Sequence, residues 1–211
     1  LPRGASPEVT VWITSSFTVG DDIYAYYISI PATWPKEPPL AGGLAVMRGG
    51  VPPFVRTGFT YPSSDPLIGV GGALIRGNYL YLYTGRSAGI DFNVFLTRVP
   101  LSELENRTAY EFLTDGGWNA NAATATRLMS NSNPPSVSFN NALGQWVSMN
   151  NAVLSENGLA SQITMRTADQ PEGPWSEPFV IYAVSDTGDG QWGSVYNPDQ
   201  HSAFDADGGR T

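Results

Sequence analysis

Residues 73–83 read ALIRGNYLYLY: an apolar run, a Gly77-Asn78 pair and a second run that alternates tyrosine with leucine. Glycine and asparagine both tolerate a positive φ, so this pair is typical of the tight turn of a β-hairpin. β-branched and aromatic residues favour strands, and tyrosine is prominent in the second run. The stretch therefore predicts a hairpin of two antiparallel strands.

The same pattern returns 63 residues later, because 136 − 73 = 63. Residues 136–139 (SVSF) and 145–149 (QWVSM) flank the turn signal NALG at 141–144. Further strands are predicted at 9–14, 22–30, 93–99, 162–167 and 179–182. Only residues 101–105 look helical, for about one turn.

These groups form a repeat whose units start near Val9, Gly71, Pro135 and Gln200. The spacings are 62, 64 and 65 residues (71 − 9, 135 − 71, 200 − 135). Four strands in a repeat of this length are typical of a blade of a β-propeller. We therefore expect an all-β fold with four-stranded antiparallel blades. A two-sheet sandwich is the alternative.

The 211 residues are expected to form a single propeller domain that is incomplete. Its blades are predicted near residues 9–60, 71–115 and 135–183, with a stub of another blade at 200–211. Propellers typically have four to eight blades, and an open ring leaves unpaired strand edges. The sequence thus favours a longer polypeptide, or another chain that completes the ring.

Composition excludes several classes of function. The net charge is −8, which disfavours partners with a phosphate backbone and anionic membrane surfaces but suits a neutral ligand. Cysteine is absent, so disulfides, thiolate nucleophiles and cysteine metal sites are excluded. No apolar run approaches the roughly 20 residues of a membrane span. The sequence also lacks a Gly-x-Ser-x-Gly elbow, a P-loop and a dinucleotide-binding fingerprint.

Two motifs are more specific than composition. They are PSVSFN at 135–140, which runs into QWV at 145–147, and RTADQPEGPWSEP at 166–178. Together they resemble the sugar-active five-bladed propellers, most of all the family catalogued as domain of unknown function 4185, some members of which are endo-D-arabinanases. The wider set includes arabinanases, xylosidases and related glycosidases. The resemblance is strongest between Gly71 and Tyr182.

The second motif has a structural interpretation of its own. Glu172-Gly173-Pro174 predicts a sharp turn, after which Trp175 folds back onto its sheet. Pro178 suits an edge strand, because proline cannot donate to a ladder. We therefore expect Trp175 to pack between blades.

The resemblance places the functional site at one end of the propeller axis, where innermost strands begin and the loops between second and third strands converge. Glycoside hydrolysis needs two carboxyl groups flanking the scissile bond. The candidate catalytic acids are Asp65, Asp91, Glu156 and Asp199. For each of them, a turn-forming or solvated carboxylate is the alternative.

Polar and aromatic side chains in the same loops are candidates for binding sugar. They are Arg86, Asn150, Trp192, Tyr196, Asn197 and His201. One axial pocket is expected to hold Asp91, Asp199 and His201 together with Arg86, Asn150 and Trp192.

No cofactor is firmly indicated. With one histidine, His201, and no cysteine, a zinc site is disfavoured. Calcium or sodium, bound by oxygen ligands in the central channel, stays open. A hydrogen-bonded core or rim histidine is the alternative for His201.

The resemblance implies a secreted, extracellular, carbohydrate-active propeller. The first hypothesis is a glycoside hydrolase-like protein that acts on a neutral oligo- or polysaccharide through axial carboxylates. A lectin, which would use the same amides and aromatic rings without paired acids, is the alternative. A scaffold propeller that binds protein is the third. Whether the chain is an enzyme stays open at this point.

Overall fold

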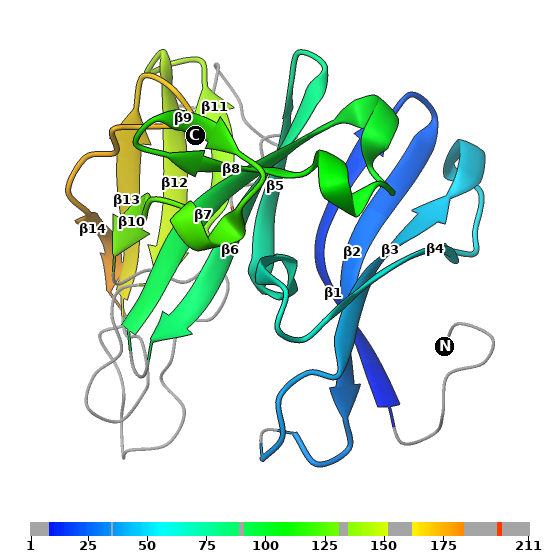
Figure 1. Ribbon diagram of the computed structural model, residues 1–211. Coiled ribbons are helices and arrows are strands. Elements are labelled where there is room, and N and C mark those ends of the chain that lie inside the picture. Colours follow the sequence, from blue (N-terminus) through cyan, green and yellow to red (C-terminus); the bar gives the residue numbers. More distant parts are fainter. Residues whose placement is uncertain are drawn as a thin grey trace.

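The computed structural model describes residues 9–34, 36–88, 91–130, 135–151, 162–183 and 198–199. These residues form an all-β fold of three antiparallel sheets that stand side by side (Figure 1). Within these ranges, the helical segments are short 3₁₀ turns, and no helix is long and apolar enough to span a membrane. The propeller expectation is confirmed as far as a propeller-like arrangement of antiparallel sheets, and the described strands do not close into a ring.

Each sheet follows the order of its strands in the chain. The first sheet comprises β1 (Val9–Val19), β2 (Asp22–Pro31), β3 (Ala41–Met47) and β4 (Val55–Pro62). The second comprises β5 (Val70–Arg76), β6 (Tyr79–Ala88), β7 (Asp91–Pro100), β8 (Glu111–Thr114) and β9 (Gly117–Asn119), with β10 (Met129–Ser130) paired to β7. The third comprises β11 (Ser136–Asn140), β12 (Gln145–Asn151), β13 (Gln162–Ala168) and β14 (Phe179–Ala183). The 3₁₀ turns are η1 (Arg48–Gly50), η2 (Pro66–Gly69), η3 (Leu101–Glu103), η4 (Arg107–Ala109) and η5 (Ala122–Thr124).

The predicted hairpins are present. Gly77 has a φ of 59° in the turn between β5 and β6, and Gly144 has a φ of 66° between β11 and β12. These values lie in the left-handed region that glycine adopts without steric cost. The short helical turn is also present, as η3. One expectation was wrong in detail: the second sheet has six strands, because β9 and β10 extend the four-stranded unit. The expected stub at 200–211 lies outside the described residues.

The sheets meet along their first strands, since β5 contacts both β1 and β11. The approach of β5 to the third sheet depends on Gly72. A Cβ atom at that position would lie 2.2 Å from the carbonyl oxygen of Pro135, a distance that no real side chain tolerates. Glycine thus sets the spacing between the second and third sheets.

The strand β6 is buried on both faces, which explains its alternating sequence. Leu80 and Leu82 lie in the first core, the apolar cluster between the first and second sheets. Tyr81 and Tyr83 lie in the second core, between the second and third sheets. Because successive residues of a strand point to opposite faces, the leucines serve one interface and the tyrosines the other.

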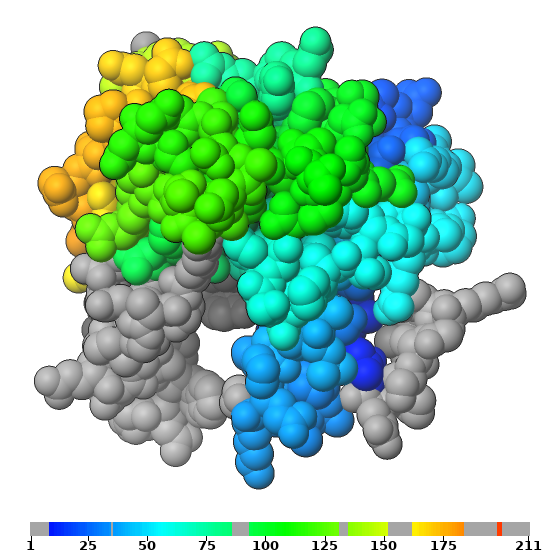
Figure 2. All heavy atoms as spheres, viewed as in Figure 1, coloured from blue at the N-terminus to red at the C-terminus, as the bar shows by residue number. Residues whose placement is uncertain are grey.

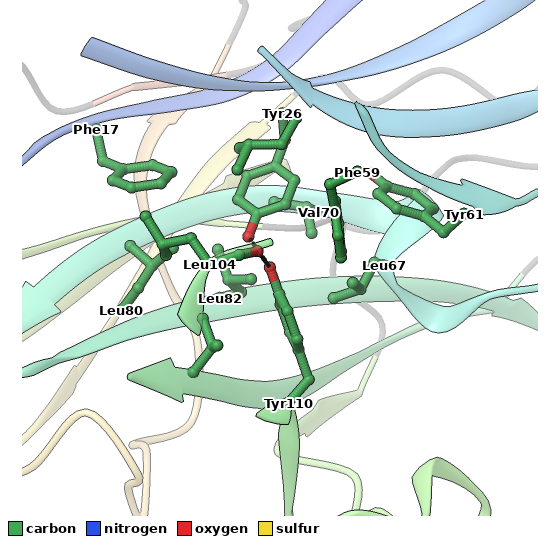
Figure 3. Close-up of a cluster of buried hydrophobic side chains, with 12 residues drawn as sticks. Phe17, Tyr26, Phe59, Tyr61, Leu67, Val70, Leu80, Leu82, Leu104 and Tyr110 are labelled. Atoms are coloured by element: carbon green, nitrogen blue, oxygen red, sulfur yellow. Dashed lines mark hydrogen bonds between the residues drawn. The ribbon is translucent and has the colours of Figure 1, made fainter. Parts of the chain in front are cut away.

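In the first core, a chain of hydrogen bonds joins the first and second sheets (Figure 3). The hydroxyl of Tyr110 donates to the carbonyl oxygen of Leu104 at 2.6 Å. Its oxygen lies 2.7 Å from the hydroxyl oxygen of Tyr26. Since Tyr110 uses its proton on Leu104, Tyr26 is the donor of the second bond. Both rings are fully buried, so these bonds satisfy polar atoms that water does not reach.

The second core confirms the structural role expected for Trp175. Its ring meets Tyr83 edge to face, with centroids 6.3 Å apart. The Tyr83 hydroxyl and the Trp175 indole N–H both donate to the carbonyl oxygen of Pro171, at 2.8 and 3.3 Å. On the surface beside this core, Arg76 reaches Gln170 and Glu172 of the same turn. The motif at 166–178 therefore clips the third sheet to the second.

Replacing the two core tyrosines should have unequal effects. Tyr110→Phe removes the donor to Leu104 and the acceptor of Tyr26, and should lower the free energy of unfolding by about 3 kcal/mol. Tyr26→Phe leaves the bond between Tyr110 and Leu104 intact and should cost only about 1 kcal/mol. Urea denaturation at neutral pH measures both. Equal losses would contradict the assigned direction of the bonds.

Stability should fall at alkaline pH. Burial raises the pKa of Tyr26 well above its usual value, and the neighbouring Tyr110 raises it further. Burial is also the main cause of the raised pKa of Tyr110. The unfolded chain then loses these protons first, so the stabilisation is complete below about pH 10 and is lost as the pH rises further. Unfolding free energies measured between about pH 8 and pH 11 should decline less steeply for Tyr26→Phe than for the wild type. Parallel curves would show that Tyr26 does not contribute.

Candidate functional site

The candidate site lies at the lower end of the molecule, by which we mean the end at the bottom of Figure 1. The first strand of each sheet begins there, and the order of each sheet then brings the connection between its second and third strands to the same end. This is the convergence predicted from the sequence. Only candidate residues that belong to these strand starts and connections can lie near one another at this end.

The second sheet brings Asp91 and Arg86 to the lower end through its backbone. Asp91 is the first residue of β7 and pairs with Ala88, near the end of β6. Arg86 pairs with Asn93, two residue pairs further along the same ladder. The backbone of both candidates is thus held in a continuous antiparallel ladder.

The third sheet brings Asp199 and Asn150 to the same end. The Ser136 hydroxyl, on the first residue of β11, donates a hydrogen bond to the exposed carboxylate of Asp199. Ser136 pairs with Met149, the residue before Asn150. Asn150 is buried, and its side-chain oxygen accepts a bond of 2.9 Å from Ser148. Asp199 and Asn150 therefore occupy one corner of this sheet.

Asp65 lies before the second sheet but is engaged in contacts of a structural kind. One carboxylate oxygen accepts from the backbone N–H of Leu67 at 2.9 Å and caps η2. Arg107 donates to both oxygens, from Nε at 2.8 Å and from Nη2 at 3.2 Å. The bond from Leu67 fits the turn-forming alternative, and the ion pair with Arg107 joins η2 to η4.

The remaining candidates lie outside the described residues. They are Glu156, Trp192, Tyr196, Asn197 and His201. Among the residues that the structure does describe, no three His, Cys, Asp or Glu side chains gather in a way that could hold a metal ion.

Buried polar groups line the third sheet near Asn150. Arg166 lies on β13, paired with Ser148, and it is almost fully buried. Its guanidinium donates to the carbonyl oxygens of Ser176 at 2.9 Å and of Ser130 at 3.3 Å. Burial lowers the pKa of Arg166, and Glu177 partly offsets that effect. Because Ser130 belongs to β10, Arg166 is a link between the second and third sheets.

Sequence reasoning missed a pair of exposed aromatic rings at the lower end. Trp12, near the start of β1, and Trp34, in the connection between β2 and β3, lie edge to face with centroids 6.1 Å apart. A signal for Trp34 was present, because the sequence predicts that the loops between second and third strands converge on the site. Trp34 lies in that loop of the first sheet, from which none of the candidates came.

Comparison with known proteins adds the family and the fold. The model of the DUF4185 family, described as a domain of unknown function, matches residues 63–205. No curated protein matches the sequence. A putative hydrolase from Bacteroides ovatus is similar in structure, with a TM-score of 0.60 at 13% identity. An exo-β-1,3-galactanase from Phanerochaete chrysosporium, solved with β-1,3-galactotriose, has a TM-score of 0.52 at 14% identity.

These two likenesses cover most of this chain but less than half of each relative. The match to the putative hydrolase covers 83% of this chain and 46% of the other. For the galactanase the shares are 85% and 38%. At this level of identity the likeness concerns the fold. The family match spans more than half of the sequence, and the chain therefore belongs to the DUF4185 family.

Proposed function

We propose that the chain is part of a secreted, extracellular, carbohydrate-active protein that hydrolyses a neutral polysaccharide at its lower end. The observation that carries this proposal is the placement of Asp91 and Asp199. They belong to different parts of the chain, yet the second and third sheets bring them to the same end. The likeness in fold to a galactanase and a putative hydrolase supports the same class of activity.

In this proposal, Asp91 and Asp199 are the two carboxyl groups of a glycosidase. One acts as a general acid and protonates the departing glycosidic oxygen, which requires a raised pKa. The other acts either as a nucleophile or as a base that activates water. Carboxyl groups about 5–5.5 Å apart would retain the anomeric configuration, and a separation of about 6.5–9.5 Å would invert it. Arg86, Asn150, Trp192, Tyr196, Asn197 and His201 would orient the sugar, with Glu156 as a further candidate acid.

The complete domain in this proposal is a five-bladed propeller, of which this chain supplies three sheets and part of another. Exposed apolar side chains on the last strand of the third sheet support this view. Phe179, Val180, Ile181 and Tyr182 of β14 all remain substantially exposed. Such a row is typical of a surface that packs against a neighbour. Further polypeptide, from this protein or another, would cover it.

A lectin is the second candidate function. Trp12 and Trp34 favour it, because exposed aromatic rings bind sugars without any need for paired acids. Arg107 also binds both carboxylate oxygens of Asp65, so this candidate acid is already engaged in an ion pair. Nucleic acids and membranes are not proposed as partners, given the net charge of −8.

Amide substitutions distinguish hydrolysis from binding. Asp91→Asn and Asp199→Asn should each lower the turnover of the hydrolysed polymer by about 10²–10⁴-fold, because an amide cannot act as acid, base or nucleophile. Binding of the same polymer should change little. Arabinan, xylan, glucan and β-1,3-galactan are the substrates to assay, with reducing ends as the readout.

Asp169→Asn is the matched control. Like Asp199, Asp169 is exposed and accepts a hydrogen bond from a side chain, here from Gln145 at 3.1 Å, but it follows the opposite end of β13. Its replacement should leave turnover unchanged. Wild-type turnover in Asp91→Asn and Asp199→Asn would remove both residues from the site. Binding by the wild type without hydrolysis of any polymer would favour the lectin.

A further inference from the structure

Trp12 and Trp34 form the most exposed aromatic pair at the lower end of the described structure. Each side chain is 41% exposed, although indole is among the most costly groups to leave in water. Their rings meet at an interplanar angle of 73°. An edge-to-face pair fixes both rings relative to one another and leaves part of each ring open to a ligand.

The register of the first sheet shows which way Trp12 faces. Trp12 pairs with Ile28, so both lie on the face of the sheet that also carries Tyr26. Tyr26 packs in the first core, toward the second sheet. Ile13 pairs with Tyr27 on the opposite face. Trp12 therefore lies on the inner face of the first sheet, on the same rung of the ladder as Tyr61 of the first core, and does not belong to the outer face.

The backbone around Trp34 is held by several hydrogen bonds. The N–H of Trp34 donates to the carbonyl oxygen of Pro31 at 3.0 Å, and the N–H of Leu40 donates to Ser29 at 2.8 Å. The Thr33 hydroxyl donates to the carboxylate of Glu37 at 2.8 Å. Figure 2 shows the connection between β2 and β3 as a blue protrusion below the body of the molecule. Trp34 is thus presented from a connection that is already organised, which lowers the entropic cost of binding.

We infer that the Trp12–Trp34 pair is a platform that binds a sugar unit of the polysaccharide. This inference rests on the proposed function and extends its site from the second and third sheets to the first. The carbon-bound hydrogens on one face of a sugar ring pack against indole, while its hydroxyls reach polar groups at the rim. Thr33 and Glu37 supply such groups on the same connection as Trp34. A neutral sugar ring suits the net charge of −8.

The platform holds a sugar unit away from the reacting bond, so it acts on binding of the polymer and not on bond cleavage. Interactions of this kind strengthen the ground state and the transition state equally. Their loss raises KM and leaves kcat unchanged. This split separates the platform from the carboxylates, whose loss lowers kcat.

The test compares Trp12→Ala, Trp34→Ala and Trp34→Phe with the wild-type chain on the four polymers named above. Affinity electrophoresis and intrinsic tryptophan fluorescence measure binding. Each alanine variant should weaken binding by about tenfold, as expected for the loss of one well-packed aromatic contact. Trp34→Phe keeps an aromatic face and should lose less. Thermal unfolding shows whether each variant is folded. If Trp12→Ala does not fold, the two Trp34 variants provide the test, because Trp34 lies in a connection between strands.

Phe139→Ala is the matched control. Phe139 is also 41% exposed and lies edge to face with Trp146, with centroids 5.4 Å apart, but it precedes the turn between β11 and β12, at the opposite end. It should bind every polymer as the wild type does. Wild-type affinity in both Trp34 variants, or an equal loss in Phe139→Ala, would overturn the platform while the proposed function stands. A wild-type chain that binds none of the polymers would overturn the proposed function and the platform with it.

Discussion

Both faces of the second sheet are buried, one against the first sheet and one against the third. The arrangement of the other two sheets depends on this constraint. Leu80 and Leu82 of β6 complete one core, and Tyr81 and Tyr83 complete the other. A shift of the strand by one residue would exchange leucines for tyrosines at both interfaces. The Tyr83 hydroxyl would then lose its acceptor on Pro171. The register of β6 is therefore fixed, and the ladder that runs on to Asp91 is fixed with it.

Local chemistry allowed much of the fold to be predicted from the sequence. Gly77 and Gly144 stand where a turn needs a positive φ, and the strands on either side follow from their alternation. The extra strands β9 and β10 were harder to foresee. The strand β10 comprises only Met129 and Ser130, and it forms because β7 offers those residues an edge. That edge exists only once the sheet has assembled.

The site was less predictable, because the same residue types serve structure and chemistry. Asp65 looks like a catalytic candidate until its partner is known, and Arg107 lies 42 residues further along the chain. A carboxylate that caps a turn and one that protonates a sugar have the same sequence signal. Trp34 was missed for a different reason. Its neighbours Pro31 and Thr33 suggest a turn, while its value as a binding surface depends on Trp12 in another strand.

The absence of a side chain at Gly72 has a consequence for the carboxylate of Asp199. The carbonyl group of Pro135 occupies the space where a Cβ would stand, and Pro135 is bonded directly to Ser136. Ser136 in turn holds Asp199. A methyl group added in the second sheet would push this segment outward and carry the acid with it. The effect of such a substitution on Asp199 would be transmitted through the backbone of Pro135 and Ser136.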